Sequence, residues 1–127
     1  MNDLDVMIER LGKRAVDLHQ ATDELNAEIE RFEERVRTTN PGVEAWLEAQ
    51  DDGGWRFGWA RRADRTWGFV ARRLDLAPLP LFSTARSVRV LASQHLAAIV
   101  TALFEETAAA TAAVDTARFD LEADDHG

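Results

Sequence analysis

The sequence predicts an α+β protein in which a long N-terminal helix, a three-stranded antiparallel β-meander and a long C-terminal helix follow one another. Three observations predict this order. An apolar heptad pattern runs over residues 3–38, three β-rich runs separated by turn residues cover 43–73, and a second helical pattern covers 84–118. A chain of 127 residues is expected to form a single domain, residues 1–127.

The first predicted helix carries an apolar seam with the a and d spacing of a coiled coil. Asn2 or Asp3 can cap its start. Asn40-Pro41-Gly42 ends it, because the residue before a proline disfavours the helical conformation and Pro-Gly suits a type II turn. At about 1.5 Å per residue such a helix is roughly 50 Å long. The helix seam consists of Leu4, Ile8, Leu11, Leu18, Leu25, Ile29, Phe32 and Val36, with Ala15 and Thr22 in the two remaining positions.

The flanks of this seam do not specify a parallel homodimer. In that arrangement Glu28 would face Glu33 of the second copy, and only Arg14 with His19 could form a favourable pair. A helix packed in a bundle and a two-stranded coiled coil therefore both remain open.

The meander is predicted from runs at residues 43–49, 55–61 and 66–73. Residues 57–69 read FGWARRADRTWGF, which is nearly its own reverse about Ala63. With a three-residue loop centred on Ala63, and Asp64 in the left-handed conformation, identical residues of the two strands would pair with each other. The expected pairs are Trp59 with Trp67, Phe57 with Phe69, and Gly58 with Gly68.

The first hairpin is predicted to turn at Asp51-Asp52-Gly53, where glycine supplies the left-handed position. This turn pairs Leu47 with Phe57, Ala45 with Trp59, Glu48 with Arg56, and Trp46 with Gly58. The sheet then has two faces. The predicted core face carries Val43, Ala45, Leu47, Trp55, Phe57, Trp59, Trp67, Phe69 and Ala71.

On the opposite face, Trp46 is predicted to lie across Gly58 and Gly68, with Arg56 and Arg72 at the ends of this strip. Two interpretations are open. The indole can cover the glycine backbone, which compensates for glycine in a strand. Alternatively, the strip is a shallow groove in which a protein partner or a planar anionic ligand stacks on Trp46 between the two arginines.

Residues 74–82 are predicted to form an extended strap, because Pro78 and Pro80 exclude a helix and a central strand. Ser83 or Thr84 would cap the second helix, residues 84–118, whose first half (85–104) is expected to be deeply buried, including Leu91, Val100 and Phe104. Residues 120–127 are interpreted as a frayed acidic tail. Since each helix is longer than the sheet, the overhangs must pair with each other or with a second subunit, and a homodimer is expected.

Several kinds of chemistry are absent from the sequence. The chain has no cysteine, no glycine-rich phosphate loop and no nucleophile elbow. Its three histidines, His19, His95 and His126, have no arranged catalytic partners. We therefore expect no catalytic residues, no metal site, no cofactor and no enzymatic activity. The longest apolar window, Leu96–Phe104, is too short for a bilayer, so a cytoplasmic protein without membrane contact is expected.

The function expected from these patterns is that of a non-catalytic protein–protein interaction module whose partner includes a second copy of itself. The plan of helix, meander and helix resembles class I secretion chaperones of bacteria at the level of the fold, which implies a small chaperone-like or inhibitor-like binding protein. The alternative is a nucleic-acid-binding accessory protein, because residues 54–90 carry eight basic and two acidic side chains in a chain of net charge −8. Its candidate contacts are Arg56, Arg61, Arg62, Arg65, Arg72 and Arg73.

Overall fold

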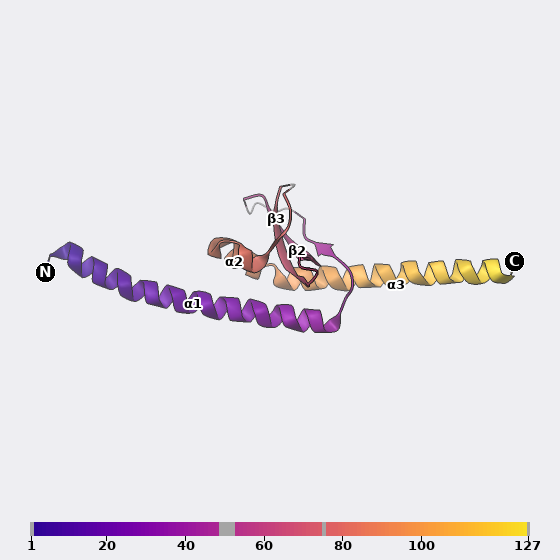
Figure 1. Cartoon of the computed structure of the whole chain (residues 1–127), viewed down its shortest axis with the longest axis horizontal. Helices are drawn as coiled ribbons and strands as arrows, with labels where there is room; N and C mark the ends of the chain where they lie inside the picture. Colours follow the sequence, from indigo (N-terminus) through magenta and orange to yellow (C-terminus); the bar gives the residue numbers. More distant parts are fainter. Residues whose placement is uncertain (1, 49–52, 75, 127) are drawn as a thin grey trace. The chain divides into compact units, whose positions relative to one another are not determined.

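A computed structural model describes residues 2–48, 53–74 and 76–126, apart from the side chain of His126. It confirms the α+β class, in which one long helix precedes an antiparallel sheet along the chain and another follows it (Figure 1). The chain divides into two compact units, Met1–Glu34 and Arg35–Gly127. The elements are α1 (Asp3–Thr39), β1 (Ala45–Trp46), β2 (Trp55–Arg61), β3 (Trp67–Arg73), β4 (Leu79–Pro80), the 3-10 helix η1 (Leu81–Ser83), α2 (Arg86–Ser93) and α3 (Leu96–His126).

The first unit is a single helical segment, the N-terminal part of α1. Its start is capped as expected, because the side-chain oxygen of Asn2 accepts a hydrogen bond from the backbone N–H of Asp5 at 2.8 Å. A single helix cannot bury its own apolar face. Whatever covers the seam of this unit must therefore come from outside the unit.

The second unit begins with the last turn of α1. The backbone N–H of Asn40 donates to the carbonyl of Arg37, and Asn40 adopts a left-handed φ of 49°, which ends the helix. Gly42 follows with φ 67°, as the third residue of a type II turn requires. Arg37 then donates from Nε and from a terminal nitrogen to the carbonyl of Trp67, at 3.0 and 2.9 Å. This pair of bonds ties the helix end to the first residue of β3.

The sheet has the order β1-β2-β3-β4, with every neighbouring pair antiparallel. Its first register is confirmed, because Ala45 pairs with Trp59 and Trp46 with Gly58. Gly53 has a φ of 67°, in agreement with the left-handed position assigned to it. The predictions for Asp51 and Asp52 lie outside the described residues.

The register predicted for β2 and β3 is wrong by two residues. Trp59 pairs with Phe69 instead of Trp67, and Gly58 pairs with Val70 instead of Gly68. A shift of two preserves the face to which each side chain points. The predicted grouping of side chains by face therefore survives, although the mirrored letters do not face one another and Val70, on the predicted outer face, is buried.

The turn of the second hairpin explains this shift. The loop is centred on Asp64 instead of Ala63, since Arg62 and Thr66 close it and Arg65 takes the left-handed conformation with φ 72°. The carboxylate of Asp64 accepts hydrogen bonds from the backbone N–H and the hydroxyl of Thr66, at 2.9 and 2.6 Å. These local bonds favour the observed loop over one centred on the mirror.

The proline-containing strap makes a short edge strand. Leu79 and Pro80 of β4 pair with Ala71 and Val70 of β3. Proline is tolerated there because an edge strand has one side without a partner strand. The sheet thus has four strands instead of the three that the sequence predicted.

The core of the second unit lies between the predicted core face of the sheet and the helices α2 and α3. Trp59 is fully buried, and its ring meets that of Phe69 edge to face with centroids 5.1 Å apart. Phe57 stacks on His95 at 5.7 Å. The buried apolar residues of this unit include Ala45, Phe57, Trp59, Ala60, Phe69, Val70, Ala71, Leu81, Val88, Ala92, Ile99 and Leu103.

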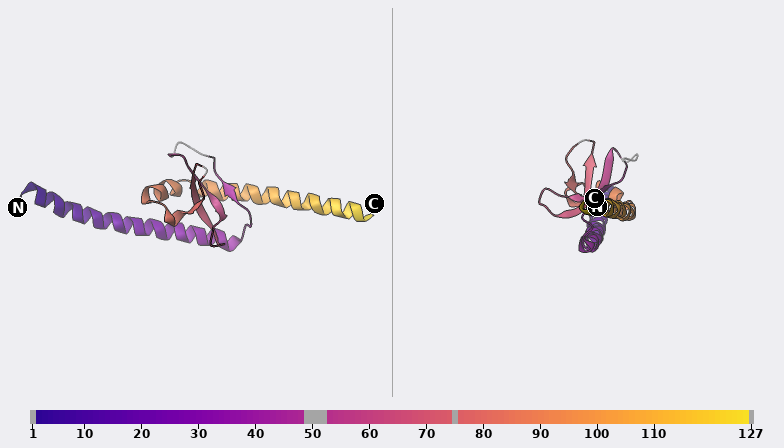
Figure 2. Two further views of the ribbon diagram at one scale, coloured as in Figure 1. Left: turned by 45° about the horizontal axis from the view of Figure 1, so that its top comes forward. Right: turned by 90° about the vertical axis from the view of Figure 1, so that its right-hand side faces the viewer.

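The second helix differs from its prediction in three ways. It is divided at Gln94–His95, where i→i+3 hydrogen bonds tighten the backbone and α2 ends. Its N-cap is Ala85, while the hydroxyl of Thr84 donates to the carbonyl of Leu81. α3 then continues to His126 through the segment expected to fray, because residues 96–126 contain neither glycine nor proline. Figure 2 shows the C-terminal half of α3 extending beyond the sheet.

Candidate functional site

Trp46 lies on the outer face of the sheet, directly opposite Gly58. A Cβ atom added to Gly58 would lie 2.4 Å from the carbonyl oxygen of Ala45, and 2.8 and 2.9 Å from two ring carbons of Trp46. Real Cβ atoms essentially never come this close to other atoms. The indole therefore covers a position where only glycine fits, as in the first of the two interpretations of this face.

Arg72 lies beside this tryptophan, and the shifted register makes Arg56 its direct partner instead of placing the two arginines at the two ends of the strip. They are direct partners on β2 and β3, so two like charges face each other across the strand pair, an arrangement that is normally unfavourable. The guanidinium carbon of Arg72 lies 4.6 Å from the centroid of the Trp46 ring, a cation–π contact. Arg56 donates from Nε to the carbonyl of Leu47 at 3.1 Å.

Two further contacts define what this group can do. Trp46 donates from its indole nitrogen to the Glu44 carboxylate at 2.7 Å, so the indole that Arg72 contacts also holds a negative charge at its edge. The Nε of Arg72 is inaccessible to solvent and has no hydrogen-bond partner among the described residues. A carboxylate or phosphate group would offset the repulsion between the two adjacent guanidinium groups, because its oxygens accept charge-assisted hydrogen bonds. A planar ligand could stack on Trp46 where Arg72 lies only by displacing Arg72.

Gly68 does not contribute to this surface in the expected way. It pairs with Ala60, while Val70, which is buried, occupies the position opposite Gly58. The predicted strip of two facing glycines is therefore wrong. The shifted register replaces the second glycine by a valine side chain.

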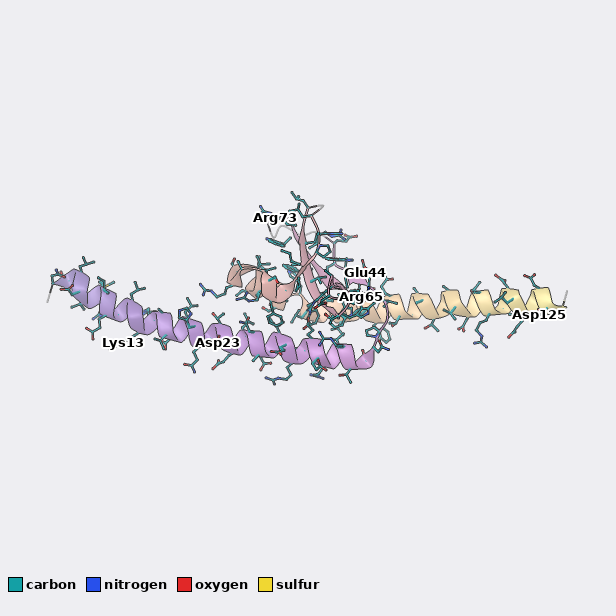
Figure 3. All side chains as sticks on the ribbon, viewed as in Figure 1. Lys13, Asp23, Glu44, Arg65, Arg73 and Asp125 are labelled. Atoms are coloured by element: carbon teal, nitrogen blue, oxygen red, sulfur yellow. The ribbon has the colours of Figure 1, made fainter. Side chains whose placement is uncertain are left out.

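The arginines proposed as nucleic-acid contacts form two groups. Arg61, Arg62 and Arg65 belong to the turn of the second hairpin, whereas Arg73 lies at the other end of β3 beside the Arg56–Arg72 pair. Figure 3 shows Arg65 and Arg73 at opposite ends of the hairpin, which seven residues per strand make about 20 Å long. Arg62 is half-buried and donates to the carbonyl of Phe69 at 3.3 Å. The six arginines do not form one continuous basic surface.

Asp64, in the turn between these strands, has a pKa below its ordinary value of 3.8. The main cause is the hydrogen bond from the Thr66 hydroxyl, followed by the bond from the Thr66 backbone N–H. A lowered folded-state pKa means that the ionised carboxylate favours the fold above pH 3.8, and that this contribution is lost as the pH falls through the folded-state value.

We expect the Thr66→Val variant to raise the pKa of Asp64 toward 3.8, because it removes the larger of the two hydrogen bonds and keeps the backbone bond. The measurement is a carboxyl NMR titration of both proteins. An unchanged pKa in the variant would show that the hydroxyl does not stabilise the carboxylate.

The helix seam lies along α1 as predicted. Its N-terminal members are open to solvent: Leu4 and Leu11 each expose 66% of their surface, and Ile8 and Leu18 are also exposed. Further along the helix Leu25 and Val36 are half-buried, Ile29 is buried and Phe32 is exposed. An apolar stripe of this length on a helix surface is typical of a site that contacts another protein.

The C-terminal part of α3 is a second exposed apolar surface, as expected for a helix longer than the sheet, but it begins earlier in the helix than the sequence predicted. Phe104 was expected to be buried and is 76% exposed, and Val100 is also exposed. By length and composition alone, Leu96–Asp125 could cross a membrane, a test that the core helix of a soluble protein also passes. Only 11% of its most apolar window is buried, so most of this surface is uncovered. The signal that could have revealed its extent is the alanine-rich run after Glu106, which lengthens the apolar segment beyond Phe104.

No group of three or more histidine, aspartate or glutamate side chains within metal-binding distance occurs in the part of the chain that the structure describes. His19 lies exposed on α1, and His95 is half-buried where α2 and α3 meet. The side chain of His126 lies outside the described residues.

No protein-family model, curated protein or solved structure matches this chain. The resemblance to class I secretion chaperones therefore gains no support from a related structure.

Proposed function

We propose that this protein is a non-catalytic protein–protein interaction module that acts as a homodimer held together by its long helices. The observation that carries this proposal is the open N-terminal seam of α1. Leu4 and Leu11 expose two thirds of their surface on a helix whose unit contains no other element to cover them.

Burial of this seam between two chains would stabilise a dimer, because it removes apolar side chains from water. Burying a leucine side chain contributes about 1.5–3 kcal/mol, so four apolar seam positions per chain can supply a substantial association energy. A second copy is always available at the same concentration as the first. Two-fold dimers are also the most common assembly of soluble proteins, because one interaction surface then serves both subunits.

We expect static light scattering across a concentration series to give a mass near twice the 14.2 kDa of the chain. The mass should fall toward that of a monomer only on dilution, because association depends on concentration. The protein should be measured at low and at high salt, since an apolar interface responds weakly to salt. A mass of one chain throughout the series would reject the proposal.

A further inference from the structure

The apolar stripe of α3 continues from the core of the second unit into the exposed part of the helix. Ile99 and Leu103 are buried where α3 packs on β1 and β2. From Leu103 onward the same helix face continues at the alternating spacing of four and three residues, and Val114 and Leu121 on it expose 59% and 67% of their surface. This α3 stripe consists of Leu103, Thr107, Ala110, Val114, Ala117 and Leu121.

The exposed part of α1 has a matching stripe. It also contains six positions with the spacing four, three, four, three, four. Coiled-coil helices pack through such positions, and an antiparallel pair places each a position of one helix opposite a d position of the other. This α1 stripe consists of Leu4, Ile8, Leu11, Ala15, Leu18 and Thr22.

Aligned antiparallel, the two stripes complement each other in side-chain size. Most bulky residues of α1 meet smaller residues of α3, which is the alternation that lets two helices pack closely. The layers outside the core are Leu4 with Leu121, Ile8 with Ala117, Leu11 with Val114, Ala15 with Ala110, and Leu18 with Thr107. The contact ends before Leu103, which the sheet of its own chain already covers.

The flanking charges favour the same pairing. In this alignment Asp5 lies beside Arg118, the one arginine in α3, which contains no lysine. Within its own helix Arg118 makes a long 3.6 Å contact with Asp115. On the same flank His19 lies beside Phe104, and no pair of like charges occurs on either flank. A parallel pairing of α1 with α1 would instead oppose Glu28 and Glu33.

We propose that α1 of one chain packs antiparallel on the exposed part of α3 of a second copy, through these two stripes. The inference rests on the proposed homodimer and names the surfaces that hold it together. A two-fold axis makes the contact reciprocal, so that both stripes of both chains are covered in one dimer. Phe104 is then covered by the helix that carries His19.

The test uses the absence of native cysteine. Ala15→Cys and Ala110→Cys are made singly and together, since Ala15 and Ala110 form a central layer and cysteine is only slightly larger than alanine. The full-length proteins are oxidised mildly, and the products are separated by mass without reductant. We expect the double variant to convert almost completely into covalent dimers and each single variant to remain as single chains, because only the two different positions meet within disulfide distance.

The contrary outcomes are distinct. Covalent dimers of the Ala15→Cys variant alone would show that α1 pairs with α1, which overturns this inference and leaves the homodimer intact. A double variant that forms its disulfide within one chain, or forms none although light scattering gives a dimer, also overturns the inference. A chain that is monomeric and forms no covalent dimer rejects the proposed function as well.

Discussion

The Gly58→Ala variant should lose about 1–3 kcal/mol of unfolding free energy, the typical cost of forcing an extra methyl group into a closely packed site. The added Cβ would lie 2.4 Å from the Ala45 carbonyl oxygen and 2.8 Å from the nearest ring carbon of Trp46. The contact with the Ala45 carbonyl cannot relax without moving β1 away from β2, because both partners belong to the backbone of paired strands. Chemical denaturation followed by tryptophan fluorescence measures this loss, because all four tryptophans lie within residues 46–67.

The control is Gly12→Ala, which adds the same methyl group at a helical glycine with nothing within 4 Å. It should not lower the denaturant midpoint seen by the tryptophans, since alanine favours a helix more than glycine does and the added methyl group meets no other atom. The double variant Trp46→Ala/Gly58→Ala separates the two contacts. It should remain less stable than Trp46→Ala alone, because the Ala45 carbonyl still meets the new methyl group. If Gly58→Ala unfolds at the same denaturant concentration as the unchanged protein, the close approach of β1 and β2 is wrong.

The largest effect on assembly is expected from the double variant Leu11→Glu/Leu18→Glu. Both residues are exposed on α1, and glutamate favours a helix about as well as leucine does, so the helix itself should persist. Each dimer would lose four buried leucines at about 2 kcal/mol each, and would have to bury carboxylates instead. The dissociation constant should therefore rise at least about a thousandfold, and light scattering at concentrations where the unchanged protein is a dimer should give a monomer.

The matched control for this variant is Val16→Glu. Val16 is 64% exposed and lies on the same helix, next to Ala15 and outside the helix seam. It should preserve the dimer, since its side chain does not face the second helix. A dimer that survives in Leu11→Glu/Leu18→Glu, with helix content unchanged by circular dichroism, would mean that the helix seam does not hold the subunits together.

Patterns over neighbouring residues were sufficient to predict which segments form helices and strands, and to place many of their ends. The heptad spacing predicted α1, Asn2 was one of the two predicted caps, and Asn40-Pro41-Gly42 was predicted as its end. The pairing of Trp46 with Gly58 also followed from the glycine turn and the alternation of the strands. In each case the interaction that decides the structure is local, or is set by a period that the sequence displays directly.

The register of the second hairpin required the three-dimensional structure. Loops centred on Ala63 and on Asp64 place every side chain on the same face, because the two registers differ by two residues. The apolar pattern therefore cannot choose between them. The choice depends on the hydrogen bonds of the Asp64 carboxylate with Thr66. The mirrored sequence, which is centred on Ala63, does not indicate these bonds.

The fold class, the extent of α1 and the grouping of side chains by sheet face follow from the sequence, because helical and strand periods are properties of consecutive residues. The break at Gln94–His95, the fourth strand at Leu79–Pro80 and the exposure of Phe104 depend instead on contacts between elements. A helix with apolar side chains all around shows no period that reveals which of them the sheet will cover. That depends on where the sheet ends, and therefore on contacts between residues far apart in the chain.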